Sequence, residues 1–510
     1  MANEKDLSVI RLKKECSYDV NSEVTLEDYK TDVKRILYCK ENVFAPSKYT
    51  SKDGIELEGT VCYRILYLGT DNRLYSTECT EEYTLNGKCD GEMAGEDVCD
   101  LTAVWSDGVT VRLLSPRKFS LKNKICSRSV LTSRHEKEDC VTEEFIPSEC
   151  EFRASKALCA TATTFGGDVL ELCDEYIPRS DTERIICSDA TVFISDVHSD
   201  DGKVSLRGEL IVDVLACDDT GYEMPYVIRR KIPFTQETEH SDIRKGAKIS
   251  ASGSCSELKI QPEEARVLIN AYCTVEYCVI ATSEESICTD AFSPLHALKL
   301  TNNKIKYVGS AYSSNGNISI STSKPLSEIG VSPSSSVLTA VGVASVSDLS
   351  VNRESGKCAV WGECRFKVIF FDDAGEEAEY EAKEISVPFR YEFAYEADGE
   401  PSLYCSDASL SRTSVRSDGE KVALDSELSL AFTVASEIEK DVISDITVGE
   451  KKPAEDACIR IIYPQNGETL WSIAKKTSAR ISHICEANGI CREDNAQDTT
   501  SVTSCRFVII

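Results

Sequence analysis

Cysteine and histidine are the residues of this chain best suited to metal binding or nucleophilic catalysis, and it contains 24 and five of them. Structural zinc sites need clustered ligands, usually with a Cys-x-x-Cys pair, but no such pair occurs and the histidines are scattered. We therefore expect no metal site. Many cysteines, such as Cys358 and Cys364, fall where a strand would bury a small hydrophobic residue, and reduced cysteine fills that role well.

Motifs for the common hydrolytic chemistries are also missing. The Gly-Lys pairs, such as Gly87-Lys88, lack the second glycine and the hydroxyl residue of a phosphate-binding loop. The chain has neither a GxSxG serine elbow nor an HExxH zinc motif, since His135-Glu136 is followed by Lys137. Spacing alone does not exclude a Cys/His dyad, so a cysteine hydrolase stays open as a minor alternative. The sequence predicts a protein that is not an enzyme and needs no cofactor.

Length and charge limit the domain count and the partners. A chain of 510 residues exceeds what one core usually organises, which favours three or four domains. The net charge of -29 repels nucleic acid and anionic lipid surfaces, and it would suit either a basic protein partner or solubility alone. The N-terminus lacks an apolar signal segment, and no window approaches the roughly 20 apolar residues of a spanning helix. We expect a cytoplasmic protein with no membrane span.

The chain contains three copies of one β unit, and these units would position any functional side chains. Gly59, Gly208 and Gly362 lie 149 and 154 residues apart, and each sits within a strand whose apolar residues alternate. The central glycine suits either a β-bulge or a close approach of another backbone. The predicted inward faces are Leu57, Val61, Tyr63 and Ile65, then Leu206, Leu210, Val212 and Val214, then Val360, Cys364, Phe366 and Val368.

Turns and prolines refine this unit. Asp218 to Gly221 and Asp372 to Gly375 suit hairpin turns, and Asp71 with Asn72 occupies that place in the first copy. Pro233 and Pro388 in the following strand imply an edge position or a bulge, and the first copy lacks this proline. We expect three β-sandwich-like repeats, over residues 1–150, 151–297 and 298–450. Polar stretches around His135 and from Ser313 to Pro325 are interpreted as exposed loops, although the second could be a strand.

The sequence of residues 459–510 predicts a small module whose elements follow the order strand, helix, helix, strand. Thr469 can cap the first helix with its hydroxyl group, and Gly489 can end the second in the left-handed conformation. His483 is expected to face solvent. The apolar residues of the two helices share the i, i+3, i+4 spacing of an amphipathic face: Leu470, Ile473 and Ala474, then Ile481, Ile484 and Cys485.

This module resembles the LysM family through GETLWSIAKK, which starts at Gly467, and the Ala-Asn-Gly of residues 487–489. The resemblance implies binding of N-acetylglucosamine glycans in a shallow groove. Trp471 could stack there on a sugar or a protein, but completing the small core is the favoured interpretation. The predicted groove residues are Gly467, Glu468, Thr469, Leu470, Trp471, Asn488, Gly489 and Ile490.

Three such β units followed by one LysM module resemble a family of clostridial spore-envelope proteins, the DUF3794 or SPOCS-domain LysM proteins. The resemblance implies a non-enzymatic morphogenetic adaptor in the mother-cell cytoplasm, at the forespore surface or in the spore coat. In that family the LysM module docks protein, and the implied partner is a coat-basement ATPase or another coat protein. The alternative is a peptidoglycan-binding protein of the cell wall or spore cortex.

Overall fold

A computed structural model describes residues 8–88, 98–134, 140–141, 146–179, 183–218, 224–241, 243–263, 265–372, 379–395, 399–453, 459–465, 468–489 and 507–510. Within these ranges nearly all regular structure is antiparallel β-strand, and two short helices lie near the C-terminus. The predicted fold class is therefore confirmed: mainly β, with sandwiches followed by a small βααβ unit.

Each repeat forms a sandwich of two β-layers, one of them built around the glycine-centred strand. In the first repeat that layer is β2 (Val33–Val43), β3 (Ser47–Ser51), β4 (Gly54–Gly69) and β5 (Leu74–Lys88), and the facing layer is β1 (Ser8–Thr25), β6 (Val98–Ser115) and β7 (Lys118–Arg134). In the second repeat β10 (Glu183–Asp200), β11 (Lys203–Asp218) and β12 (Tyr226–Glu239) face β8 (Glu151–Gly166), β9 (Leu170–Tyr176), β13 (Lys248–Pro262) and β14 (Val267–Phe292).

The third repeat repeats the plan with longer strands. Its glycine-centred layer is β16 (Ser336–Asn352), β17 (Lys357–Asp372) and β18 (Glu379–Ala394), facing β15 (His296–Pro325), β19 (Glu400–Ser417) and β20 (Lys421–Lys451). The stretch from Ser313 to Pro325 thus lies within β15, so its interpretation as a loop was wrong. Its serines and asparagines obscured the alternation, but their backbone pairs with β20 throughout. The stretch around His135 lies largely outside the described residues.

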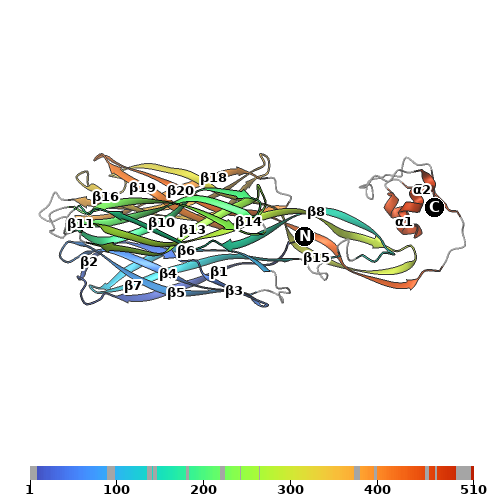
Figure 1. Ribbon diagram of the computed structural model, residues 1–510, viewed down its shortest axis with the longest axis horizontal. Coiled ribbons are helices and arrows are strands. Elements are labelled where there is room, and N and C mark those ends of the chain that lie inside the picture. The colour runs from blue at the N-terminus through green and yellow to red at the C-terminus, as the bar shows by residue number, and fades with distance from the viewer. Residues whose placement is uncertain are drawn as a thin grey trace.

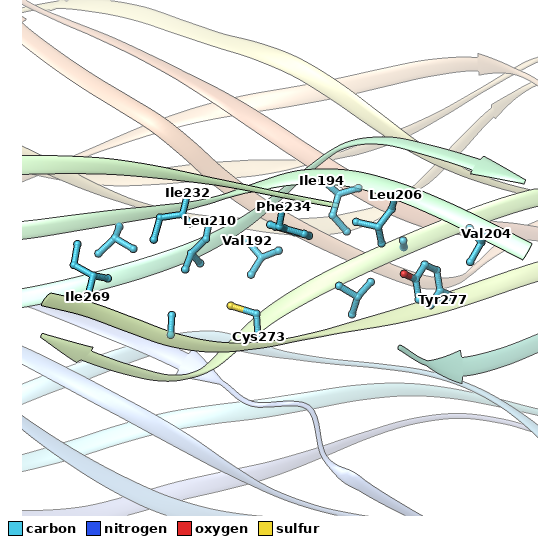
Figure 2. Packing of buried hydrophobic residues seen from close by; sticks show 14 of the residues in the cluster. Val192, Ile194, Val204, Leu206, Leu210, Ile232, Phe234, Ile269, Cys273 and Tyr277 are labelled. Atoms are coloured by element: carbon cyan, nitrogen blue, oxygen red, sulfur yellow. The ribbon is translucent and has the colours of Figure 1, made fainter. Parts of the chain in front are cut away.

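The period-two pattern identified the inward faces correctly. All twelve predicted inward residues are buried, each exposing at most 1% of its surface. Figure 2 shows the second repeat, where Leu206 and Leu210 of β11 meet Ile269, Cys273 and Tyr277 of β14 between the layers. The removal of this apolar surface from water is the main contribution to the stability of a β-sandwich.

Two of the central glycines, Gly208 and Gly362, lie where an aromatic ring and a bulge meet, whereas the near neighbour of Gly59 is the Tyr83 ring. A Cβ at Gly208 would lie 2.6 Å from Cζ of Phe234 on one neighbouring strand and 2.7 Å from the Phe193 carbonyl oxygen on the other. The pairing of β10 with β11 shifts register beside Gly208, and that of β16 with β17 shifts beside Gly362. Both sequence interpretations therefore hold at Gly208 and Gly362, because the bulge brings a carbonyl close.

The predicted turns and proline positions are described in part. Asn72 adopts φ of 60° in the turn between β4 and β5, as Asp or Asn can in a tight hairpin. Pro233 and Pro388 lie in β12 and β18, which are edge strands of their sheets, so the edge prediction is confirmed. The hairpin turns of the other two repeats fall largely outside the described residues.

The repeats are joined by a shared sheet and a shared core. The order β19-β20-β15-β1-β7-β6 makes one six-stranded sheet from the facing layers of the third and first repeats. A cluster that we call the junction core holds equivalent residues of all three glycine-centred strands: Leu66 and Leu68, Leu215 and Cys217, Ile369 and Phe371. Members of each set lie 149 and 154 residues apart, the spacing of the central glycines. The three repeats thus pack on one another through the same surface.

The body is elongated, and the C-terminal module lies at one end (Figure 1). The strands that reach toward it are long: β14, β15 and β20 have 26, 30 and 31 residues. His296, at the start of β15, pairs with Lys451, at the end of β20. The module is β21 (Ile461–Ile462), α1 (Leu470–Thr477), α2 (Ile481–Asn488) and β22 (Val508–Ile509), the order predicted from the sequence.

Candidate binding site

The module is held in shape by its helix ends. The Thr469 hydroxyl accepts a hydrogen bond from the Ser472 backbone N–H at 3.2 Å, and the Ser472 hydroxyl accepts one from the Thr469 N–H at 3.0 Å. This reciprocal pair satisfies N–H groups that a helix start leaves without partners. At the other end Gly489 has φ of 64°, and its N–H bonds the carbonyls of the last turn of α2. Both predicted caps are confirmed.

The core of the module is small and includes one residue of the body. Leu470, Ile473 and Ala474 of α1 pack against Ile481, Ile484 and Cys485 of α2, with Val508 and Trp471 completing the cluster. Phe292, the last residue of β14, belongs to the same cluster, and its ring centre lies 5.1 Å from that of Trp471 in an edge-on arrangement. Such pairs of aromatic rings add to the gain from burial alone.

Asp290 links the module to the body by polar contacts. Its carboxylate accepts a hydrogen bond from the Trp471 indole N–H at 2.9 Å and lies 2.6 Å from Lys475 Nζ. Lys452 adds a second connection, because its ammonium group donates to the Ser293 carbonyl and to the Ser478 hydroxyl, each at 2.8 Å. The module is therefore docked on the tip of β14.

The predicted groove residues separate into buried and surface positions. Leu470 and Trp471 are buried, so the favoured interpretation of Trp471 as a core residue agrees with its position. Glu468 is half-buried and accepts a hydrogen bond from the Gln465 N–H at 2.8 Å, and Thr469 is the helix cap. Gly467 and Ile490 lie outside the described residues. His483 is exposed, as predicted.

Asn488 has an internal role that the sequence did not indicate. Its side-chain N–H groups donate to the carbonyls of Ile484 and Ile509, each at 2.7 Å, and its oxygen accepts from the Ile509 N–H at 2.8 Å. The side chain thus ties the end of α2 to β22. An amide used in this way has little hydrogen-bonding capacity left for a ligand.

The outer face of the two-stranded sheet is apolar and exposed. Ile459, Ile461 and Tyr463 alternate along one chain segment and expose 70%, 56% and 71% of their surface. On the other segment, Phe507 is 46% exposed and the partly exposed Ile509 pairs with Ile461. We call these five residues the apolar face. A concentrated apolar surface on a soluble domain commonly marks an interaction site.

A concave region lies between the repeats, and the sequence did not indicate it. A cavity of about 660 Å³, the inter-repeat cavity, is lined by β2, β6, β10, β13, β16 and β19. Equivalent positions of the three repeats contribute Lys40, Asp189 and Val343 to its wall. Alternation along these strands shows which residues share a face, but it does not show that the polar face points toward another repeat.

Two aspartates of this cavity differ in whether a cation pairs with them. Asp189 forms an ion pair with Lys40 and lies 3.5 Å from Arg64. Burial alone would raise the pKa of Asp189, but the two cations outweigh it and the pKa is lowered. Asp407 is exposed to the cavity, but the protein that surrounds it displaces water and raises its pKa, with a further contribution from Glu276.

The described residues contain neither a cluster of metal-ligating side chains nor a membrane-spanning helix. Among the described residues no group of three or more His, Cys, Asp or Glu side chains could hold a metal ion. His240 stacks on Phe165 with ring centres 4.4 Å apart, and His296 lies 3.2 Å from Glu149. In the described part of the chain, no helix has the length and apolar character needed to cross a membrane.

Comparison with known proteins adds no relative to this picture. No family of known proteins, no curated protein and no solved structure matches the chain. The resemblance to LysM and to the spore-envelope family therefore rests on the residues quoted for it.

Proposed function

We propose that the protein is a non-enzymatic adaptor that docks a protein partner through the apolar face of its C-terminal module. The observation that carries the proposal is the apolar face itself, where Ile459, Ile461 and Tyr463 are more than half exposed. Large exposed apolar and aromatic side chains supply most of the energy at protein interfaces. The module lies at one end of an elongated body, where a partner can approach it (Figure 1).

The chemistry of the partner follows from the charge of the chain. With a net charge of -29, the protein attracts a partner surface that is basic around an apolar centre. The family resemblance implies a coat-basement ATPase or another spore-coat protein, met in the mother-cell cytoplasm at the forespore surface. The adaptor would display the module while the three sandwiches serve as its rigid support.

Glycan binding is the second candidate, and the loop entering α1 favours it. Glu468, Thr469 and Leu470 precede and open the helix as the LysM resemblance requires. Two positions weigh against it. Trp471 packs on Phe292 and donates to Asp290, and the Asn488 amide is bonded to the backbone. Neither side chain is presented to a sugar.

The adaptor proposal is tested with the full chain and matched surface variants. Purified coat-basement ATPase is titrated onto the immobilised wild type, the I461S/Y463S double variant and an I177S control. Ile177 is 82% exposed on the body, so its replacement removes an equally exposed apolar residue elsewhere. We expect binding that weakens at least tenfold in the double variant and is unchanged in I177S. Equal binding by all three proteins, or none by the wild type, contradicts the proposal.

The glycan candidate has its own measurement. The wild type, the double variant and the control are mixed with purified peptidoglycan and sedimented beside a known LysM protein. The adaptor proposal expects all three to stay in solution. Sedimentation of the wild type that N-acetylglucosamine oligomers inhibit, with I461S/Y463S unaffected, favours the groove over the apolar face.

A further inference from the structure

Two cysteines of the second repeat face each other across neighbouring strands. Cys255 of β13 and Cys273 of β14 are direct partners in the antiparallel register. In all the strand pairings that the structure describes, no other cysteine lies opposite a cysteine. Cys39, Cys62 and Cys79 lie on adjacent strands, for example, but they face Ile65, Thr80 and Tyr63.

Both side chains point to the same side of the sheet. Cys273 is fully buried in the core of the second repeat, and Cys255 packs against that core. Figure 2 shows the Cys273 sulfur among the hydrophobic side chains between the layers. Cys255 is only partly buried and lines the inter-repeat cavity. One thiol of the pair is therefore reachable through the cavity, while the other is held behind it.

The contact makes the two thiols unequal in acidity. The side-chain contact with Cys273 lowers the pKa of Cys255. The same contact, together with burial, raises the pKa of Cys273. The accessible thiol is thus the better nucleophile, since the thiolate is the reactive form of cysteine.

The backbone permits a covalent bond between them. Side chains directly opposite in an antiparallel pair have Cβ atoms about 5 Å apart, and a disulfide needs about 4 Å. The required approach is small, and the register shift between Cys255 and Glu257 places a bulge beside the pair. A bulge bends its strand locally and can supply this movement.

We propose that Cys255 and Cys273 are a peroxide-oxidisable dithiol that closes to an intramolecular disulfide. The Cys255 sulfur attacks hydrogen peroxide, the O–O bond breaks, and water leaves with the thiol proton, giving a sulfenic acid. The Cys273 sulfur then attacks the Cys255 sulfur, the S–O bond breaks, and a second water leaves with the Cys273 proton. The two sulfurs lose two electrons in total and the peroxide is reduced to two waters.

The test maps cysteines in the full chain after mild oxidation. Reduced protein is treated with hydrogen peroxide, its remaining thiols are alkylated, and its peptides are analysed by mass spectrometry. We expect a Cys255–Cys273 linked peptide, lighter by two hydrogens than its reduced parts. Cys173 is the comparison, because it is exposed and faces Asn270 and not a thiol. The linked peptide should form at least ten times faster than Cys173 is oxidised. Dithiothreitol should reverse it.

Single variants separate this pair from general cysteine oxidation. C273S should leave Cys255 as a sulfenic acid that dimedone captures, whereas C255S should leave Cys273 unmodified behind the cavity wall. C79S, at a cysteine that faces Tyr63, should leave the link intact. The proposal is overturned if Cys173 oxidises before any linked peptide appears in the wild type. It is equally overturned if Cys255 links to a different cysteine in the wild type. Should C273S not fold, modification of Cys273 in C255S is the outcome that contradicts the proposal.

Discussion

The body and the C-terminal module solve the problem of burying apolar surface in different ways. The body packs three sandwiches on a common junction core, so its repeats depend on one another through equivalent residues such as Leu66, Leu215 and Ile369. The module has one small core, and it borrows Phe292 and Asp290 from the tip of β14. A unit of about 50 residues has little core of its own. We therefore expect the module's stability to depend on its docking to the body.

The largest effect that would distinguish the two regions is expected for W471A. This change removes the most bulky buried side chain of the module and its hydrogen bond to Asp290, at a cost of about 3–5 kcal/mol. Hydrogen exchange should show loss of protection confined to α1 and α2, with the body strands unchanged. W361A is the control, because Trp361 is 42% exposed on β17. Protected helices in W471A would mean that docking is dispensable for the module.

Truncation in the junction core tests the opposite region. L66A, L215A and I369A each remove a buried aliphatic side chain at an equivalent position, and each should cost about 2–5 kcal/mol. Since the three residues share one core, each variant should lower the melting temperature of all three repeats together, as followed by calorimetry. The module should keep its protected helices until the body melts. A variant that melts its own repeat alone would show that the repeats are independent domains.

The inward faces of the strands and the helix caps could be predicted from the sequence, but the packing of the repeats on one another could not. The alternation of apolar residues identified Leu57 and Val61 as facing inward. It did not show that Leu66 and Leu68 are buried by another repeat. The signal was present as the continuous apolar run around these residues, which is typical of a strand buried on both faces.

The docking of the module was beyond local sequence patterns for a different reason. Trp471 and Asp290 are 181 residues apart, and no periodicity connects them. The caps at Thr469 and Gly489 were predictable because capping depends on neighbouring residues alone. The role of Asn488 was not, since it depends on where β22 returns.

Within the body, the two aspartates of the inter-repeat cavity should respond in opposite ways. D189N leaves Lys40 and Arg64 without their carboxylate and should cost about 2 kcal/mol at neutral pH. D407N removes a charge that burial disfavours, so it should raise stability slightly at neutral pH. Urea unfolding of each variant beside the wild type measures both. A stabilised D189N would show that its ion pairs are not maintained in solution.

The pH dependence of these variants follows from the direction of each pKa shift. The lowered pKa of Asp189 stabilises the folded state above the unfolded pKa, and this contribution is lost as pH falls through the folded pKa. The raised pKa of Asp407 acts in reverse, since the folded state binds the proton more tightly and gains stability as pH falls. D189N should therefore flatten the acid-side loss of stability, and D407N should steepen it.

The smallest loss of stability is expected when the N-terminal cap of α1 is removed from the module. T469A removes the hydroxyl that accepts the Ser472 N–H and should cost about 1 kcal/mol. T477A is the matched control, because the Thr477 hydroxyl donates back to the Ile473 and Ala474 carbonyls within the same helix, contacts that add little stability. Hydrogen exchange of α1 measures both. If docking dominates, T469A should accelerate exchange at the start of α1 but leave the contacts of Trp471 and Lys475 with Asp290 in place. A T469A variant that lost the whole module would mean that the cap, and not the body, sustains it.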